Sequence, residues 1–201
     1  MTETYENLAD LIDYPGADWN SKLAAITADA LLNEFRSRIA TLSLSEAQEL
    51  YTRTFDLNPL CALEIGYHLF GENYKRGEFL ANLRETEAPF DLGQETQLPD
   101  YLPVLLRLVA RLKDEDLRSS LISDCLLPAL DKMLNSLKES DNPYRFLFAA
   151  LRTTLQSEVP VVSADASRVR MRGYLPVLAN AGTSIEIIRM PFDNNHSRDL
   201  F

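Results

Sequence analysis

The fold is decided by residues 98–112, LPDYLPVLLRLVARL, which carry the clearest helical pattern in the sequence. Apolar side chains recur there at spacings of three and four residues, namely Leu102, Leu105, Leu106, Val109 and Leu112. Pro99 and Pro103 both fit the start of a helix, where backbone amides lack partners in any case. We therefore predict a helix from this point that buries one apolar face.

The same spacing predicts helices on both sides of this segment. We expect them over 5–14, 18–41, from Ser45 to about 57, 58–71, 74–87, 116–137 and from 142 to about 157. Ser45 and Gln48 have the spacing of a capping box. Asn58-Pro59 and Asn142-Pro143 each combine a cap with a proline in the first turn. Pro128 should kink or divide the helix in which it lies.

Composition and charge exclude several classes of protein. The chain has 201 residues with 30 acidic and 20 basic side chains, so its net charge is −10, which disfavours nucleic acid as a partner. Only 7 glycines and 10 prolines occur, and this scarcity favours helices over turn-rich β folds. The N-terminus lacks the pattern of a secretory signal, and no uncharged run is long enough for membrane insertion. We expect a cytoplasmic protein whose two cysteines are buried free thiols.

The fold class predicted from these patterns is all-α. Residues 1–157 should form a single compact, bundle-like helical domain. The character of the chain changes after that, because 159–162 and 185–188 are β-like and no helical stripe follows. Residues 158–201 are therefore expected to form an irregular C-terminal appendage.

Four short segments occur in an order that resembles a known family. They are Tyr51-Thr52-Arg53-Thr54-Phe55-Asp56, Tyr67-His68-Leu69-Phe70-Gly71-Glu72-Asn73, Lys75-Arg76-Gly77 and Leu98-Pro99-Asp100-Tyr101-Leu102-Pro103. Over about residues 5–155 this resembles the NarJ branch of the redox-enzyme maturation chaperones, to which TorD and DmsD are related. The sequence departs from the family at Tyr101, where the family has histidine, and at Gln97, where it has glutamate.

The resemblance implies an all-helical cytoplasmic chaperone that is not an enzyme and needs no cofactor or metal of its own. Its partner would be the apo form of a molybdopterin oxidoreductase catalytic subunit, such as a nitrate reductase. The chaperone would hold the N-terminal or signal segment of that subunit until the molybdenum cofactor is inserted. Relatives exchange helices between protomers, so a homodimer that uses the region around Pro128 as a hinge is also considered.

A groove for such a segment needs apolar walls and carboxylates at its mouth. We expect Asp56, Glu72 and Asp100 to supply the negative charge. The complete predicted peptide-binding set is Tyr51, Phe55, Asp56, Tyr67, His68, Glu72, Arg76, Pro99, Asp100, Tyr101, Leu102 and Pro103. Each has a structural alternative: Asp100 fits a helix cap, and Tyr51 and Phe55 fit the core.

Two other functions remain open at this point. Glu64, His68 and Glu72 lie four residues apart on one stripe of the predicted helix, so a helical enzyme or metal-binding protein could use them. A structural subunit held permanently in a complex is the other alternative. No nucleophile or phosphate-loop motif occurs in the sequence.

Overall fold

The computed structural model describes residues 2–25, 29–93 and 96–159. Within these ranges the chain is helical and contains no strand, which confirms the predicted all-α class. The α-helices are α1 (Thr2–Ile12), α2 (Trp19–Ala24), α3 (Ala30–Ile39), α4 (Leu44–Tyr51), α5 (Ile65–Phe70), α6 (Lys75–Glu87), α7 (Leu102–Arg111), α8 (Glu115–Ser120), α9 (Leu127–Ser136) and α10 (Tyr144–Glu158). Two π-helical segments, η1 (Thr52–Asp56) and η3 (Leu121–Leu126), and one 3-10 turn, η2 (Pro59–Cys61), complete the order.

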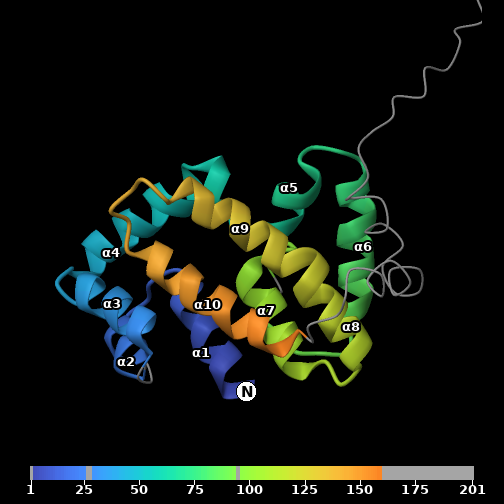
Figure 1. Cartoon of the computed structure of the whole chain (residues 1–201), viewed down its shortest axis with the longest axis horizontal. Coiled ribbons are helices and arrows are strands. Elements are labelled where there is room, and N and C mark those ends of the chain that lie inside the picture. The colour runs from blue at the N-terminus through green and yellow to red at the C-terminus, as the bar shows by residue number, and fades with distance from the viewer. Residues whose placement is uncertain (1, 26–28, 94–95, 160–201) are drawn as a thin grey trace, which may run out of the picture.

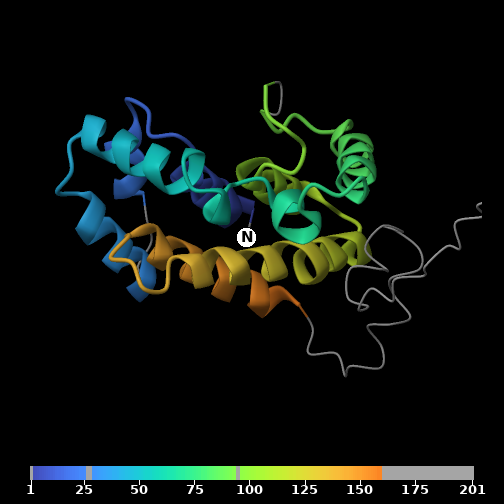
Figure 2. The ribbon, with the colours of Figure 1, turned by 90° about the horizontal axis from the view of Figure 1, so that it is seen from above.

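The helices pack around one continuous core. Helices α9 and α10 run side by side along one side of the molecule, and α1 packs against α7 behind them (Figures 1 and 2). The chain from α4 through η1 and η2 to α5 crosses the top of the view in Figure 1. Fully buried side chains come from most of these elements and include Tyr5, Phe35, Phe79, Leu102, Leu105, Tyr144 and Phe148. Burying each such side chain stabilises the fold by about 1.5–3 kcal/mol.

Charged side chains reinforce the contact between α1 and α7. The Nη2 atom of Arg107 lies 2.8 Å from Asp10 Oδ1 and 3.0 Å from Asp13 Oδ2. Arg111, one turn later, pairs with Glu6 at 2.5 Å. Acids spaced one turn apart on α1 thus meet arginines spaced one turn apart on α7, and this fixes the register of the two helices.

The structure corrects two predicted boundaries near the N-terminus. The single helix expected over 18–41 is two helices, α2 and α3, and Asp29 caps α3 by accepting from the amides of Leu31 and Leu32. The capping box of α4 is formed by Ser43 and Glu46, not by Ser45 and Gln48. The carboxylate of Glu46 accepts from both the amide and the hydroxyl of Ser43, which an amide side chain would do more weakly.

The helix predicted over 58–71 is also divided. Asn58 caps a single 3-10 turn, as its side chain accepts from the amide of Leu60. The chain is then extended until α5 begins at Ile65, and α5 ends as predicted at Gly71, whose φ is +60°. In the extended stretch Glu64 forms an antiparallel bridge with Tyr101. Backbone pairing with a distant segment has therefore replaced helical hydrogen bonds here.

The helix predicted over 116–137 runs without interruption through α8, η3 and α9, and Pro128 lies where the π-helical segment changes to α-helix. The chain passes from α8 into η3, and α9 begins at Leu127 with the proline in its first turn. A proline has no amide to donate, so a π-helical segment directly before it accommodates the missing bond. Asn142 lies one residue before the N-cap of α10, which is Pro143, and its Oδ1 accepts from the amide of Tyr144, the first residue of that helix.

Helix α10 continues to Glu158, and the tail predicted over 158–201 lies almost entirely outside the described residues. Its irregular structure, and the division of the chain at residue 157, remain predictions. Within the ranges that are described, no helix is both long enough and apolar enough to cross a bilayer.

Candidate functional site

A groove of about 560 Å³ lies where η1, η2, α5 and the start of α7 meet. It is lined by Tyr51, Phe55, Asp56, Pro59, Ala62, Leu63, Glu64, Tyr67, Arg76, Leu98 and Tyr101. Six of these belong to the predicted set, so the structure brings together side chains from all four quoted segments. The second and third segments contribute Tyr67 and Arg76.

Aromatic rings form the floor of the groove. Tyr51 and Phe55 are each 4% exposed, and their rings meet edge to face at 4.8 Å. Phe55 also contacts the fully buried Tyr144, with ring centroids 4.7 Å apart. The alternative that these aromatics belong to the core is therefore correct, and the same rings also face the groove. Because both rings are almost completely buried already, they give the groove a rigid floor, and a ligand would gain little further buried area from them.

Tyr101 connects the floor to helix α1. Its hydroxyl lies 3.0 Å from the hydroxyl of Tyr51 and 3.0 Å from Asp13 Oδ1. Burial is the main reason that the pKa of the Tyr101 phenol is raised, and nearby Tyr51 and Asp13 raise it further. The group therefore stays a neutral donor. Where the resembled family has an imidazole, this protein has a phenol bound to a carboxylate.

Two carboxylates and one guanidinium lie along the groove. Asp56 is exposed at the end of η1, and Glu64 is half-buried in the extended stretch before α5. Neither forms an ion pair with another of the described side chains. Arg76, in the first turn of α6, contributes the positive charge. Free carboxylates in a partly enclosed groove attract basic groups.

Asp100 does not lie at the mouth of the groove, contrary to the prediction. It is fully buried beside the groove, where Oδ2 accepts from the amide of Gly66 at 3.0 Å and from Arg76 at 3.2 Å (Nε) and 3.1 Å (Nη2). The capping alternative is also wrong, because α7 begins after Tyr101 and has no side-chain cap. Burial raises the pKa of the Asp100 carboxyl, and the charge of Arg76 opposes that rise.

The remaining predicted residues lie around the groove. Glu72 follows α5, is exposed and does not line it. Pro99, Leu102 and Pro103 are buried supports for the start of α7. The prediction that Glu72 adds charge to this groove is thus not met by the structure.

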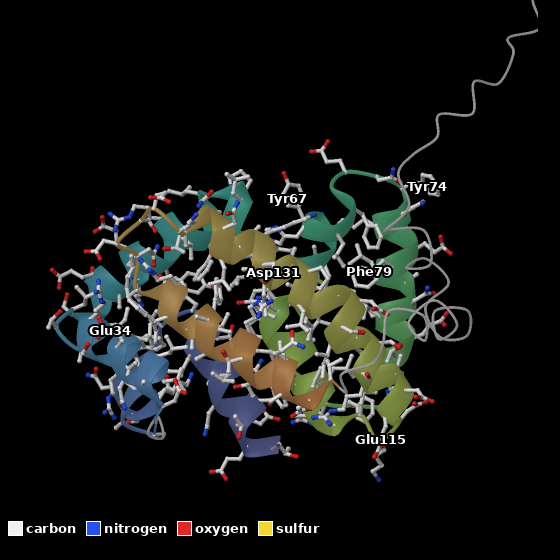
Figure 3. The ribbon with its side chains drawn as sticks, in the orientation of Figure 1. Glu34, Tyr67, Tyr74, Phe79, Glu115 and Asp131 are labelled. Atoms are coloured by element: carbon white, nitrogen blue, oxygen red, sulfur yellow. The ribbon has the colours of Figure 1, made fainter. Side chains whose placement is uncertain are left out.

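His68 lies in a second cavity of about 550 Å³ that shares Pro59 and Tyr67 with the groove. Its Nε2 is 2.7 Å from the carbonyl oxygen of Ala62, and burial lowers the pKa of its imidazole. Lys132 donates to the backbone carbonyl of His68. Tyr67 projects outward on the α5 side, between the two cavities (Figure 3).

The stripe of Glu64, His68 and Glu72 does not exist in the fold. Glu64 precedes α5 in extended conformation, and Glu72 follows the positive-φ glycine that ends it. Only His68 of the three belongs to the helix. Among the described residues, no three histidine, cysteine or acidic side chains are grouped so that they could hold a metal ion.

Sequence reasoning missed three contributions to this site. Leu57, Leu60 and Leu98 are 74%, 67% and 46% exposed, and Leu60 and Leu98 line the two cavities. The sequence suggests Glu64 only as part of an enzymatic or metal-binding group with His68 and Glu72, and not as a residue of this groove. Leu57 and Leu60 lie on either side of the Asn58-Pro59 pair, and this position is the sequence signal that could have indicated them. Their exposure itself follows from the way the chain breaks between η1 and α5.

A larger cavity of about 780 Å³ lies between α3, α4 and residues 140–143. Arg38, one of the two arginines that line it, is already bound by Glu34 and Asp141 at 2.7 and 2.6 Å. It lacks the aromatic floor of the groove, so we do not assign the site to it.

The comparisons with known proteins agree with this geometry. The sequence is 28% identical over 166 residues to the probable nitrate reductase molybdenum cofactor assembly chaperone NarJ of Bacillus subtilis, covering 77% of this chain and 89% of that protein. It is 29% identical over 147 residues to the corresponding probable chaperone NarW of Escherichia coli, covering 70% of this chain and 63% of that protein.

Both names describe assembly chaperones, which supports the prediction that this chain is not an enzyme, and the resemblance to the NarJ branch is confirmed. The profile of the nitrate reductase delta subunit family matches residues 20–150, which include the groove. This chain therefore belongs to the nitrate reductase delta subunit family.

Proposed function

We propose that this protein is a cytoplasmic assembly chaperone for a molybdenum oxidoreductase of the nitrate reductase type. In this proposal the groove binds the N-terminal segment of the apo catalytic subunit and holds it while the cofactor is inserted. The names of the two relatives support the chaperone role. The groove itself is the observation on which the peptide-binding role rests.

The chemistry of the groove suits a segment that is apolar on one side and basic elsewhere. Tyr51 and Phe55 provide an aromatic floor, and the exposed Leu60 and Leu98 extend the apolar surface. Covering exposed leucines with a ligand is favourable at about 25 cal/mol per Å² of apolar surface buried. Asp56 and Glu64 are available to pair with lysine or arginine of the segment.

Binding of this kind needs no chemical step. While the segment is bound, mass action stabilises the apoenzyme form in which that segment is still accessible. Once the mature enzyme buries the segment, the chaperone loses its ligand and dissociates. Because the groove is small and partly polar, we expect reversible binding and not a permanent complex.

The test is titration calorimetry of the full chain with a peptide of the first twenty or so residues of the partner catalytic subunit. Asp56→Lys should weaken binding at least about threefold, because it replaces an attraction for basic residues with a repulsion. Glu85→Lys is the matched control, since Glu85 is an exposed acid on α6 that does not line the groove. Equal dissociation constants for both variants would remove the groove as the site.

The same preparation tests the remaining alternatives. A structural subunit would stay with the assembled, cofactor-loaded enzyme in size-exclusion chromatography, whereas a chaperone should be released from it. A homodimer would appear in sedimentation experiments on the chain alone.

A further inference from the structure

Arg76 is held in one orientation at the groove wall. Its Nε and Nη2 atoms both donate to Oδ2 of Asp100, at 3.2 and 3.1 Å, and its side chain is 24% exposed. A guanidinium is planar, so when the edge formed by Nε and Nη2 faces inward, Nη1 points away from the carboxylate. Nη1 makes no hydrogen bond within the described part of the protein.

Asp100 is held by backbone hydrogen bonds from the residues at the start of α5. The amide of Gly66 donates to Oδ2 at 3.0 Å, and the amide of Ile65 donates to the Asp100 carbonyl at 2.8 Å. The next pair in this short ribbon joins the amide of Leu102 to the carbonyl of Leu63 at 2.9 Å. A buried carboxylate with these constraints cannot follow a moving arginine, so it positions Arg76.

The charges along the groove decide which acceptor Arg76 can take. The positive charge of Arg76 is balanced by Asp100, and Asp56 and Glu64 then leave the groove negative. A carboxylate of an incoming peptide would be repelled by these acids. A neutral main-chain carbonyl would not be repelled by them. It would also accept a strong hydrogen bond, because a charged donor forms stronger hydrogen bonds than a neutral one.

Building on the proposed function, we propose that the outward edge of Arg76 binds a main-chain carbonyl oxygen of the captured segment, and that Asp100 is the residue that positions it. Arg76 then contributes affinity independent of the side chains of the segment. Asp56 and Glu64 supply the preference for basic residues. This division lets one groove accept N-terminal segments of differing sequence that share only their basic and apolar character.

The first test is Arg76→Lys, which keeps the pair with Asp100 but removes the outward edge. We expect the dissociation constant for the N-terminal peptide to rise about tenfold, because one hydrogen bond from a charged donor is lost. The loss should be similar at low and high salt, since the acceptor is neutral. A loss that high salt abolishes, or that appears only with peptides containing acids, would overturn the proposal in favour of a carboxylate acceptor.

The second test locates the contact on the wild-type chain and then uses Arg76→Lys to assign it to this residue. Peptides in which single amide bonds are replaced by esters carry one weakened carbonyl each. One position should bind several-fold more weakly to the wild type, and this penalty should vanish in Arg76→Lys. If no ester position weakens binding, or if the penalty persists in the variant, the contact does not exist.

Asp100→Asn tests the positioning role. The substitution removes the negative charge that balances Arg76. Adding a glutamate to the peptide should therefore raise the dissociation constant less for this variant than for the wild type. A residue that served only the fold would weaken all peptides equally. If the wild type binds none of the peptides, the proposed function itself fails; if it binds them and Arg76→Lys binds equally, only this inference fails.

Discussion

Replacing Gly66 by alanine should destabilise the protein, although alanine is normally the better residue within a helix. An ideal Cβ at Gly66 would lie 2.7 Å from Asp100 Oδ2, closer than real Cβ contacts allow. The Phe79 ring would be 3.1 Å away on the other side. The carboxylate must therefore move, and it cannot do so without weakening its bonds to the Gly66 amide and to Arg76.

The expected size follows from these opposing effects. Alanine gains about 1 kcal/mol from helix propensity and lower unfolded-state entropy. Overpacking costs about 1–3 kcal/mol, and weakened hydrogen bonds to a buried charge cost about 1.5–3 kcal/mol. We expect a net loss of about 2 kcal/mol. For a chain of this size that lowers Tm by about 4–8 °C.

Urea unfolding and calorimetry can measure this, with Gly77→Ala as the control. Gly77 also lies in a helix, α6, but a Cβ there meets nothing within 4 Å. Gly77→Ala should therefore stabilise by up to about 1 kcal/mol. If Gly66→Ala matched the control, the tight approach of α5 to the Asp100 carboxylate would be refuted.

Three further changes test other features. Glu87 is a fully buried carboxyl that has no hydrogen-bond partner among the described residues, and burial raises its pKa to about 7. Between about pH 4.5 and pH 7 the folded state thus keeps a proton that the unfolded state releases. As the pH rises through this range, the free energy of unfolding of the wild type should fall by up to about 3 kcal/mol relative to Glu87→Gln. Urea unfolding at several pH values measures this difference. Ser43→Ala should cost about 1 kcal/mol by thermal melting, whereas Ser45→Ala should be nearly neutral. Tyr101→Phe leaves Asp13 without its buried donor, and calorimetry should show a loss of about 1–2 kcal/mol.

The helical class could be predicted from sequence because its signals are local. The face of residues 102–112 repeats every three or four positions, and each Asn-Pro pair does start a turn or helix. The cap at α4 shows the limit of such signals. Ser43 with Glu46 and Ser45 with Gln48 fit the same pattern, and only the stronger, charged acceptor separates them.

The break before α5 could not be predicted locally. Residues 58–71 have a cap, a proline and apolar spacing, all of which favour one helix. The chain is instead extended at Leu63 and Glu64, where it pairs with the backbone around Tyr101. That partner comes from another part of the sequence, so a window of local residues holds no trace of it. The same break exposes Leu60 and opens the groove.

Asp100 shows how a correct motif can suggest a wrong role. Beside a proline at a helix start, an aspartate fits a cap, and within a binding motif it fits a surface charge. The burial of Asp100 is tolerated only because Arg76 and the amide of Gly66 donate hydrogen bonds to its carboxylate. Neither of these residues is close to Asp100 in the sequence. A buried carboxylate that lost this arginine would be strongly destabilising, so the two residues act as one unit. The segments that carry them must therefore occur together, and the part of the unit that lines the groove is the guanidinium and not the acid.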